Sequence, residues 1–306
     1  MLWGRVYFAA QAAAGAAWWL AVALSPFVRE ATLGSLDPLR VAVFDVPLFV
    51  VASAVAAWGA RAAAWLATGW TLLVALGMAA YATVTTEAGW GVLAMAAAAA
   101  GSVVALSLVV FGRVPTAWIA SGPFAARPAV RRRSAAAHLA STLGQIVVFW
   151  GFFLVVVPLV LAFLERRWDV GVPLPWFTGI VGAVALALAC VLGLWSAFSM
   201  AVLGEGTPLP AAMANRLVIA GPYRVIRNPM AVSGIAQGVA VGLLLSSWLV
   251  VVYALLGSLL WNYAVRPFEE ADLEERFGDE YRRYRDSVRC WVPGVPRARD
   301  VPLAAR

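Results

Sequence analysis

Apolar runs of roughly 20 residues, the length of a helix that crosses a bilayer, recur along the chain between short polar segments. Six such runs precede residue 204, and the second of them contains an ionisable residue, Asp45. The predicted spans are Val6–Ser25, Val41–Trp58, Ala63–Val84, Gly91–Phe111, Leu143–Leu164 and Phe177–Leu203. The pattern predicts an all-α fold, a polytopic integral membrane helical bundle.

A seventh apolar run, Val232–Val265, is too long for one crossing, because as a single helix it would measure about 51 Å. Ser246-Ser247 lies near its centre and favours a hairpin tip. We therefore predict two short spans here and about eight transmembrane helices in all.

The chain turns polar after Val265 and predicts a cytoplasmic C-terminal helical tail. Apolar residues there are spaced four, four, three and four apart, which is the period of one helix face. They are Leu273, Phe277, Tyr281, Tyr284 and Val288. The other face carries half of the chain's 16 acidic residues, between Glu269 and Asp286. Since a helix lying on lipid headgroups is normally basic, we expect this one to fold back onto the protein, with a possible interruption at Gly278.

The composition supports a membrane protein and excludes several other classes. The chain is 63% hydrophobic and 13% charged, whereas soluble domains are about half apolar and about a quarter charged. This argues against a soluble enzyme, a disordered chain and a disulfide scaffold. Two cysteines and one histidine, His138, favour neither a metal site nor a Ser-His-Asp triad.

The chain has a net charge of +7, and its 23 basic residues are all arginine; their placement indicates membrane orientation rather than nucleic-acid binding. With the N-terminus in the cytoplasm, all but four of the 23 arginines lie inside. The segments 112–137 and 204–231 and the C-terminus are then cytoplasmic, in an integral membrane protein of a bacterial plasma membrane. Ala21-Val22-Ala23 resembles a signal-peptidase site, and cleavage there would leave seven spans.

Asp45 is an ionisable residue inside a predicted span, which by default suggests a function or a buried partner. The alternative is that it lies near the outer interface or pairs with Arg40.

The segment with candidate functional residues begins later in the chain. Gly221-Pro222 predicts a turn, Asn228 a helix N-cap, and Pro229 the first helical position. Free N–H groups at that helix start, with nearby arginines, suit a carboxylate; the arginines alternatively anchor the helix at lipid headgroups.

Two motifs carry a family resemblance. Gly-Pro-Tyr-Arg-x-x-Arg-Asn-Pro-Met (221–230) is followed, after the two-span hairpin, by Glu-Glu-x-x-Leu-x-x-x-Phe-Gly-x-x-Tyr-x-x-Tyr (269–284) and Arg-x-Trp-x-Pro (289–293). In this order they resemble the isoprenylcysteine carboxyl methyltransferase and phospholipid methyltransferase superfamily, over roughly residues 143–293. The chain would then divide into an N-terminal four-span module (1–112), a basic cytoplasmic linker (113–137) and a methyltransferase-like membrane domain with a cytoplasmic cofactor pocket (138–306).

The resemblance implies an S-adenosylmethionine-dependent methyltransferase that acts on a lipid-like carboxylate or amine. Arg266 is the nearest candidate for the family's substrate-binding arginine, and by the chemistry of the transfer an amine acceptor would lose a proton to Glu270 or to water; these two residues are the predicted catalytic ones. The cofactor-binding residues, with Tyr281 added as an aromatic wall, would be Arg216, Leu217, Val218, Tyr223, Asn228, Pro229, Met230, Ala231, Glu269 and Tyr281. Glu269 and Glu270 are alternative partners for the cofactor's ammonium, and the acceptor and the oligomeric state are left open.

The sequence departs from the family pattern at two positions, since the usual histidine is Asn228 and the usual second tyrosine is Ala231. Asparagine forms hydrogen bonds but takes up no proton at neutral pH, which favours a carboxylate or an already neutral acceptor. The main alternative is a membrane reductase of the sterol-reductase type that uses NADPH, because its tail is similar. A third hypothesis is a non-catalytic membrane scaffold.

Overall fold

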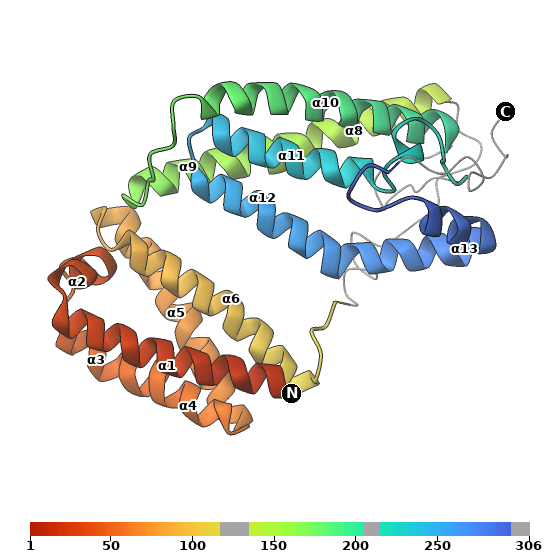
Figure 1. Ribbon diagram of the computed structural model, residues 1–306. Coiled ribbons are helices and arrows are strands. Elements are labelled where there is room, and N and C mark those ends of the chain that lie inside the picture. The colour runs from red at the N-terminus through yellow and green to blue at the C-terminus, as the bar shows by residue number, and fades with distance from the viewer. Residues whose placement is uncertain (117–134, 205–214, 295–306) are drawn as a thin grey trace. The chain divides into compact units, whose positions relative to one another are not determined.

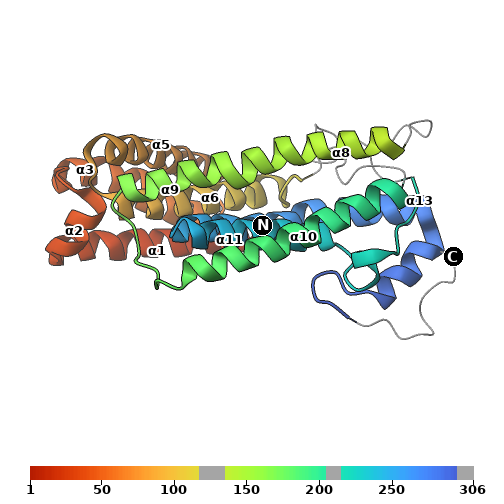
Figure 2. The ribbon, with the colours of Figure 1, turned by 90° about the horizontal axis from the view of Figure 1, so that it is seen from above.

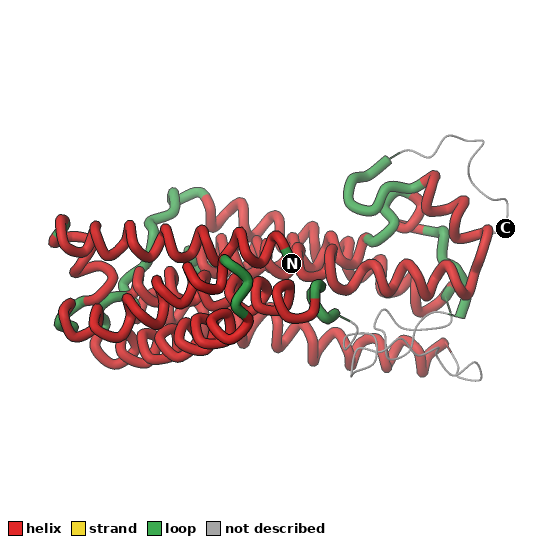
Figure 3. Tube along the Cα trace, turned by 90° about the horizontal axis from the view of Figure 1, so that it is seen from below, coloured by secondary structure: helices red, strands yellow, loops and turns green. Residues whose placement is uncertain are grey.

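The protein is described by a computed structural model over residues 1–116, 135–204 and 215–294. Helices joined by loops make up these residues, and none of them forms a strand (Figure 3). The α-helices are α1 (Leu2–Leu24), α2 (Pro26–Leu33), α3 (Pro38–Asp45), α4 (Ala52–Ala57), α5 (Arg61–Thr85), α6 (Gly89–Phe111), α8 (Ala135–Trp150), α9 (Val157–Arg167), α10 (Thr178–Leu203), α11 (Pro229–Leu244), α12 (Trp248–Leu260) and α13 (Arg266–Ser287). The fold class predicted from the sequence is confirmed.

Seven helical stretches of the described chain are long and apolar enough to cross a membrane. They are Leu2–Leu24, Pro38–Ala57, Arg61–Thr85, Gly89–Phe111, Thr142–Arg167, Thr178–Leu203 and Trp248–Ser287. The eighth predicted span is α11, which is about 24 Å long at 1.5 Å per residue and therefore shorter than the other seven. In the last stretch the apolar residues end at Val265, so α13 continues beyond the apolar span.

Three of these spans contain a π-helical segment, which the hydrophobic pattern did not predict. The segments are η1 (Val46–Val51), η2 (Gly151–Val156) and η5 (Trp261–Val265). Pro47 within η1 lacks a backbone N–H, which locally removes an α-helical hydrogen bond. Segments of this kind are frequently found at functional sites, and η5 leads directly into the first charged turn of α13.

The hairpin predicted at Ser246-Ser247 is confirmed. Helix α11 ends at Leu244 and α12 begins at Trp248. The hydroxyl of Ser247 accepts a hydrogen bond from the backbone N–H of Val250 at 3.3 Å, so Ser247 is the N-cap of α12. Ser246 adopts a positive φ of 50° in the tight turn.

The chain forms two compact units. The N-terminal unit contains Met1–Pro115 and Phe163–Gly171, and the C-terminal unit contains Thr116–Ala162 and Val172–Arg306. Most of the basic linker expected at 113–137 lies outside the described residues, as does the 205–214 part of the predicted cytoplasmic segment 204–231.

The N-terminal unit packs α1, α4, α5 and α6 through small residues and a buried polar network. Gln11 of α1 donates to Ser53 Oγ at 3.0 Å and accepts from Ser102 Oγ at 2.8 Å. All three side chains are buried and hydrogen-bonded to one another, so the network holds three elements together without an unpaired polar group. The 163–171 segment joins this unit through Arg167, which donates to the carbonyl oxygen of Thr83 at 2.6 Å.

In the C-terminal unit α10 runs beside α11, and α11 packs against α12 (Figures 1 and 2). Close approach of α10 and α11 requires Gly193, because a Cβ there would lie 2.5 Å from Ser233 Oγ. Ser233 in turn donates to the carbonyl oxygen of Ala189 at 2.7 Å. This contact fixes the N-terminal half of α11, from which the candidate site is built.

Candidate active site

The C-terminal helix folds back onto the loop that precedes α11, as the sequence predicted. Gly278 breaks α13 with φ 52° and ψ −125°, so the expected interruption is present. Beyond the break Tyr281, Tyr284 and Val288 form a buried cluster. Leu217 and Ile219 of the loop pack against this cluster, so apolar burial holds the two distant segments together.

Hydrogen bonds connect the same two segments. Tyr284 donates its hydroxyl hydrogen to the carbonyl oxygen of Tyr223 at 2.7 Å. The backbone N–H of Arg227 donates to the carbonyl oxygen of Arg289 at 2.9 Å, and that of Gly294 donates to Val225 at 3.0 Å. The residues after α13 therefore follow the 223–227 stretch.

The turn before α11 is a 3₁₀ helix, η4 (Gly221–Arg224), that buries Pro222 and Tyr223. Gly221 has φ 56°, a conformation that favours glycine, and a Cβ at this position would lie 2.8 Å from Ser199 Oγ of α10. The turn is therefore pressed against α10. Burial raises the pKa of Tyr223 well above its ordinary value, so its phenol stays protonated.

Asn228 caps α11 and Pro229 takes the first helical position, as predicted. The Asn228 side-chain oxygen accepts from the backbone N–H of Ala231 at 3.0 Å. Val232 N–H donates to the Asn228 carbonyl oxygen at 3.3 Å, and proline has no N–H. Within the described residues, the Met230 N–H is the one first-turn group for which no acceptor is recorded, so the expectation of several free N–H groups for a carboxylate is wrong.

Arg227 connects the loop to the C-terminal helix, and its side chain is only 13% exposed. One terminal nitrogen donates to the carbonyl oxygens of Arg285 (2.8 Å) and Val288 (3.2 Å). The other donates to Glu270 Oε1 at 2.9 Å. Arg227 was expected only as one of the arginines near the start of α11, and its contacts with the C-terminal helix were not predicted, because its partners lie far along the chain.

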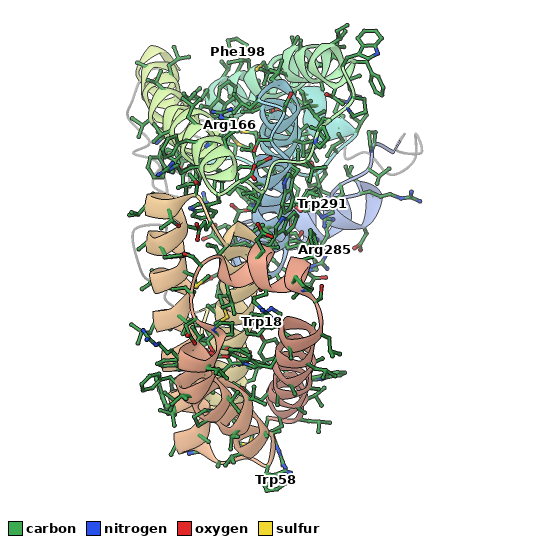
Figure 4. The ribbon with its side chains drawn as sticks, turned by 90° about the vertical axis from the view of Figure 1, so that its left-hand side faces the viewer. Trp18, Trp58, Arg166, Phe198, Arg285 and Trp291 are labelled. Carbon is green, nitrogen blue, oxygen red and sulfur yellow. The ribbon has the colours of Figure 1, made fainter. Side chains whose placement is uncertain are left out.

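Arg266 approaches the same carboxylate from the start of α13. Its Nε lies 3.5 Å from Glu270 Oε1, and its Nη1 donates to Asn262 Oδ1 at 2.7 Å. Trp291 Nε1 also donates to Asn262 Oδ1, at 3.1 Å. Asn262 belongs to η5, so this π-helical segment places the amide where both donors reach it. Figure 4 labels Trp291 and Arg285, which both belong to the C-terminal segment.

Three buried donors of this cluster have no hydrogen-bond acceptor within the described chain. They are Arg227 Nε, Arg266 Nε and the Tyr281 hydroxyl. Unpaired buried polar groups are rare and costly in proteins. Their concentration around Glu270 indicates a place where a polar group of another molecule completes the hydrogen bonding.

Glu269 is half-buried beside this cluster. Burial, and secondarily the neighbouring Glu270 carboxylate, raises the pKa of Glu269 to about 7. Burial likewise raises the pKa of Tyr281 to about 12, so the phenol is a donor at neutral pH. The site therefore contains a carboxyl group that titrates near neutrality next to an ion-paired one.

A family model described as phospholipid methyltransferase matches residues 177–280, which covers α10, α11, α12 and most of α13. This chain belongs to the superfamily of integral membrane methyltransferases that contains those enzymes and the isoprenylcysteine carboxyl methyltransferases. The resemblance seen in the motifs is thereby confirmed, and the reductase alternative is not favoured.

A short segment of this membrane methyltransferase is also similar to a bacterial protein. A protein of Haemophilus influenzae (strain Rd) whose function is uncharacterised is 43% identical over 49 residues, which is 15% of this chain and 78% of that protein. No solved structure matches the chain.

The methyltransferase fold brings most of the implied site residues together. Arg266, Glu269, Glu270 and Tyr281 share one cluster with Arg227, while Tyr223 and Leu217 hold the loop against it. Val218 is buried, and Pro229, Met230 and Ala231 form the first turn of α11. Arg216 is exposed on the loop, outside the buried cluster.

Proposed function

We propose that this chain is an S-adenosylmethionine-dependent methyltransferase that methylates a lipid-like carboxylate or amine. The reaction would take place at the cytoplasmic face of a bacterial plasma membrane. The observation that carries the proposal is the concentration of unpaired buried donors next to two carboxyl groups, one of them titrating near neutrality. The family match supplies the reaction class, methyl transfer.

The residues present fit the amino-acid end of this methyl donor. Its carboxylate would take hydrogen bonds from the Tyr281 hydroxyl and from Arg227 Nε, the donors that lack an acceptor. Its ammonium would pair with Glu269, which gains its negative charge easily near neutral pH. Trp291, which stacks edge-on against Trp261 at 5.2 Å, offers an aromatic wall for the cationic sulfonium.

Bound S-adenosylmethionine supplies an electrophilic methyl group for in-line displacement by an acceptor nucleophile. The contribution of the chain is to hold both reactants in line, which lowers such barriers by roughly 7–11 kcal/mol. Arg266, whose Nε makes an ion-pair contact of 3.5 Å with Glu270 but no hydrogen bond, would orient an anionic acceptor. Glu270, a predicted proton acceptor, is already bonded to Arg227, so we assign it a positioning role, and an amine acceptor would lose its proton to water.

The first experiment separates methyl transfer from reduction. The purified full-length protein in lipid nanodiscs is titrated with S-adenosylhomocysteine and with NADPH, and methyl-labelled S-adenosylmethionine is then incubated with the protein and a total lipid extract. We expect saturable binding of S-adenosylhomocysteine and label in one lipid species. Binding of NADPH alone would instead support the reductase.

A matched pair of variants ties the activity to the site. Glu269→Gln removes the proposed ammonium partner, and Glu275→Gln changes an exposed glutamate on the same helix. We expect S-adenosylhomocysteine affinity to fall by about 30-fold for the first, the effect of losing one partner of a buried charge pair, and to stay unchanged for the second. Equal affinity in all three proteins would favour the non-catalytic scaffold.

A further inference from the structure

The N-terminal unit contains a cavity of about 380 Å³, which is within the usual size of small-molecule sites. It lies among α1, α2, α3, α5 and α6 and is lined mainly by apolar side chains. The space exists because two helices present small residues to it at helical spacing. These residues are Ala10, Ala14 and Gly15 of α1 and Gly91, Ala94 and Ala98 of α6.

Asp45 at the end of α3 is the one charged residue in the lining of this cavity, and its side chain is buried. Trp19 Nε1 donates to Oδ2 and Trp70 Nε1 donates to Oδ1, each at 2.9 Å. Both oxygens accept a hydrogen bond from an indole, so the carboxyl group is held in one orientation, and each oxygen keeps a lone pair for a further donor. The two tryptophans fix the carboxylate without neutralising it.

No arginine of the described chain neutralises Asp45. The expected alternative, a pair with Arg40, is absent, because the structure records no ion pair for Asp45. A carboxylate buried inside a membrane span is costly unless it is paired with a cation. Gln11, a polar residue that also lines the cavity, already forms hydrogen bonds with Ser53 and Ser102.

We propose that this cavity binds an apolar membrane-soluble molecule that carries one protonated amine, with the amine paired to Asp45. The small-residue faces of α1 and α6 receive the apolar body, and Trp18, labelled in Figure 4, contributes an aromatic wall. The site lies wholly in the N-terminal unit, outside the 177–280 segment that matches the methyltransferase family. It is thus a second site, independent of the proposed methyl transfer.

The test compares three probes that share one alkyl chain and differ in the headgroup: decylammonium, decanol and decanoate. Binding of each radiolabelled probe to the full-length protein in nanodiscs is measured against empty nanodiscs. We expect one saturable decylammonium site per chain, with decanol and decanoate bound at least about 30-fold more weakly, as for loss of one charge of a buried pair. Equal affinity for decylammonium and decanol overturns the proposal.

Two variants separate the headgroup contact from the cavity. Asp45→Asn keeps the shape and the capacity to accept from one indole, and we expect it to lower decylammonium affinity to that of decanol. Ala94→Phe fills the cavity and should abolish saturable binding of all probes, whereas Ala97→Phe, at an exposed position outside the lining, should bind normally. Unchanged decylammonium binding in Asp45→Asn, or in a folded Ala94→Phe protein, refutes the site.

Discussion

At the scale of single residues, Arg227 joins the two halves of the candidate site. Its guanidinium donates hydrogen bonds to two carbonyl oxygens and one carboxylate oxygen, all on the C-terminal segment. Its backbone N–H donates to a third carbonyl oxygen of that segment. A planar fork with several fixed donors is needed for this, which a lysine ammonium does not provide. Removing it leaves several acceptors unpaired at once.

We expect Arg227→Met to lower the free energy of unfolding by about 2 kcal/mol, because buried acceptors and Glu270 lose their donors. Arg227→Lys should restore only part of this loss, since one ammonium cannot span the same acceptors. Thermal unfolding of the detergent-solubilised protein measures the effect. Arg224→Met, at an exposed position in the same turn, is the control, and a loss equal to that of Arg227→Met would contradict the assignment.

Glu269 gives the site a pH dependence. Without ligand, the folded protein binds a proton at Glu269 more tightly than the unfolded chain does, so this group stabilises the fold at acid pH and its contribution disappears as the pH rises through about 7. Binding of an ammonium has the opposite sign, because it requires the ionised carboxylate.

We therefore expect S-adenosylhomocysteine affinity to fall by about tenfold for each pH unit below about 7, and to be nearly constant between about pH 7.5 and pH 8. Calorimetric titration across this range measures it. In Glu269→Gln the affinity should be weak and independent of pH, and a wild-type protein with the same flat profile would show that Glu269 does not face the ligand.

At the scale of elements, the sequence predicts helices and caps that depend on neighbouring residues, but it does not predict contacts between segments far apart in the chain. Seven of the eight predicted spans follow from apolar length and are long enough to cross a membrane, and the Asn228 cap, which follows from adjacent residues, is confirmed. The π-helical segment η5 was not predicted, because its backbone geometry leaves no signature in an apolar run. The Arg227 contacts were missed because carbonyl acceptors carry no side-chain identity, and only packing of the tail brings them near.

The bend of α13 depends on Gly278. Its φ of 52° with ψ of −125° is unfavourable for any residue with a Cβ, although a Cβ there would meet no atom within 4 Å. We expect Gly278→Ala to destabilise the folded tail by about 1–3 kcal/mol through backbone strain alone and to weaken S-adenosylhomocysteine binding.

Gly257→Ala is the matched control, because Gly257 also has free space for a Cβ but lies inside α12. Alanine in a helix interior is favoured over glycine by up to about 1 kcal/mol, so this variant should be as stable as the wild type or more stable. Limited proteolysis of the C-terminal segment reports the difference, and equal protection of both variants would mean that the bend is not under strain.

At the scale of the whole molecule, the two units carry different chemistry. The N-terminal unit contains a mainly apolar cavity with one carboxyl group in its lining, and the C-terminal unit gathers arginines and carboxylates outside its apolar spans. The family match falls within the second unit alone. The arginine distribution along the chain should place the charged cluster of the second unit on the cytoplasmic side.

Orientation can be measured with single cysteines and a membrane-impermeant maleimide. In a background carrying Cys190→Ala and Cys290→Ser, Glu275→Cys places a thiol on the exposed face of α13 and Trp176→Cys places one before α10. Because most arginines flank the α13 side, we expect Glu275→Cys to react only in inverted membrane vesicles and Trp176→Cys only in intact cells. The reverse pattern would put the charged cluster outside, where no cytoplasmic methyl donor reaches it, and reaction of both thiols on one side would mean that α10, α11 and α12 do not all cross the membrane.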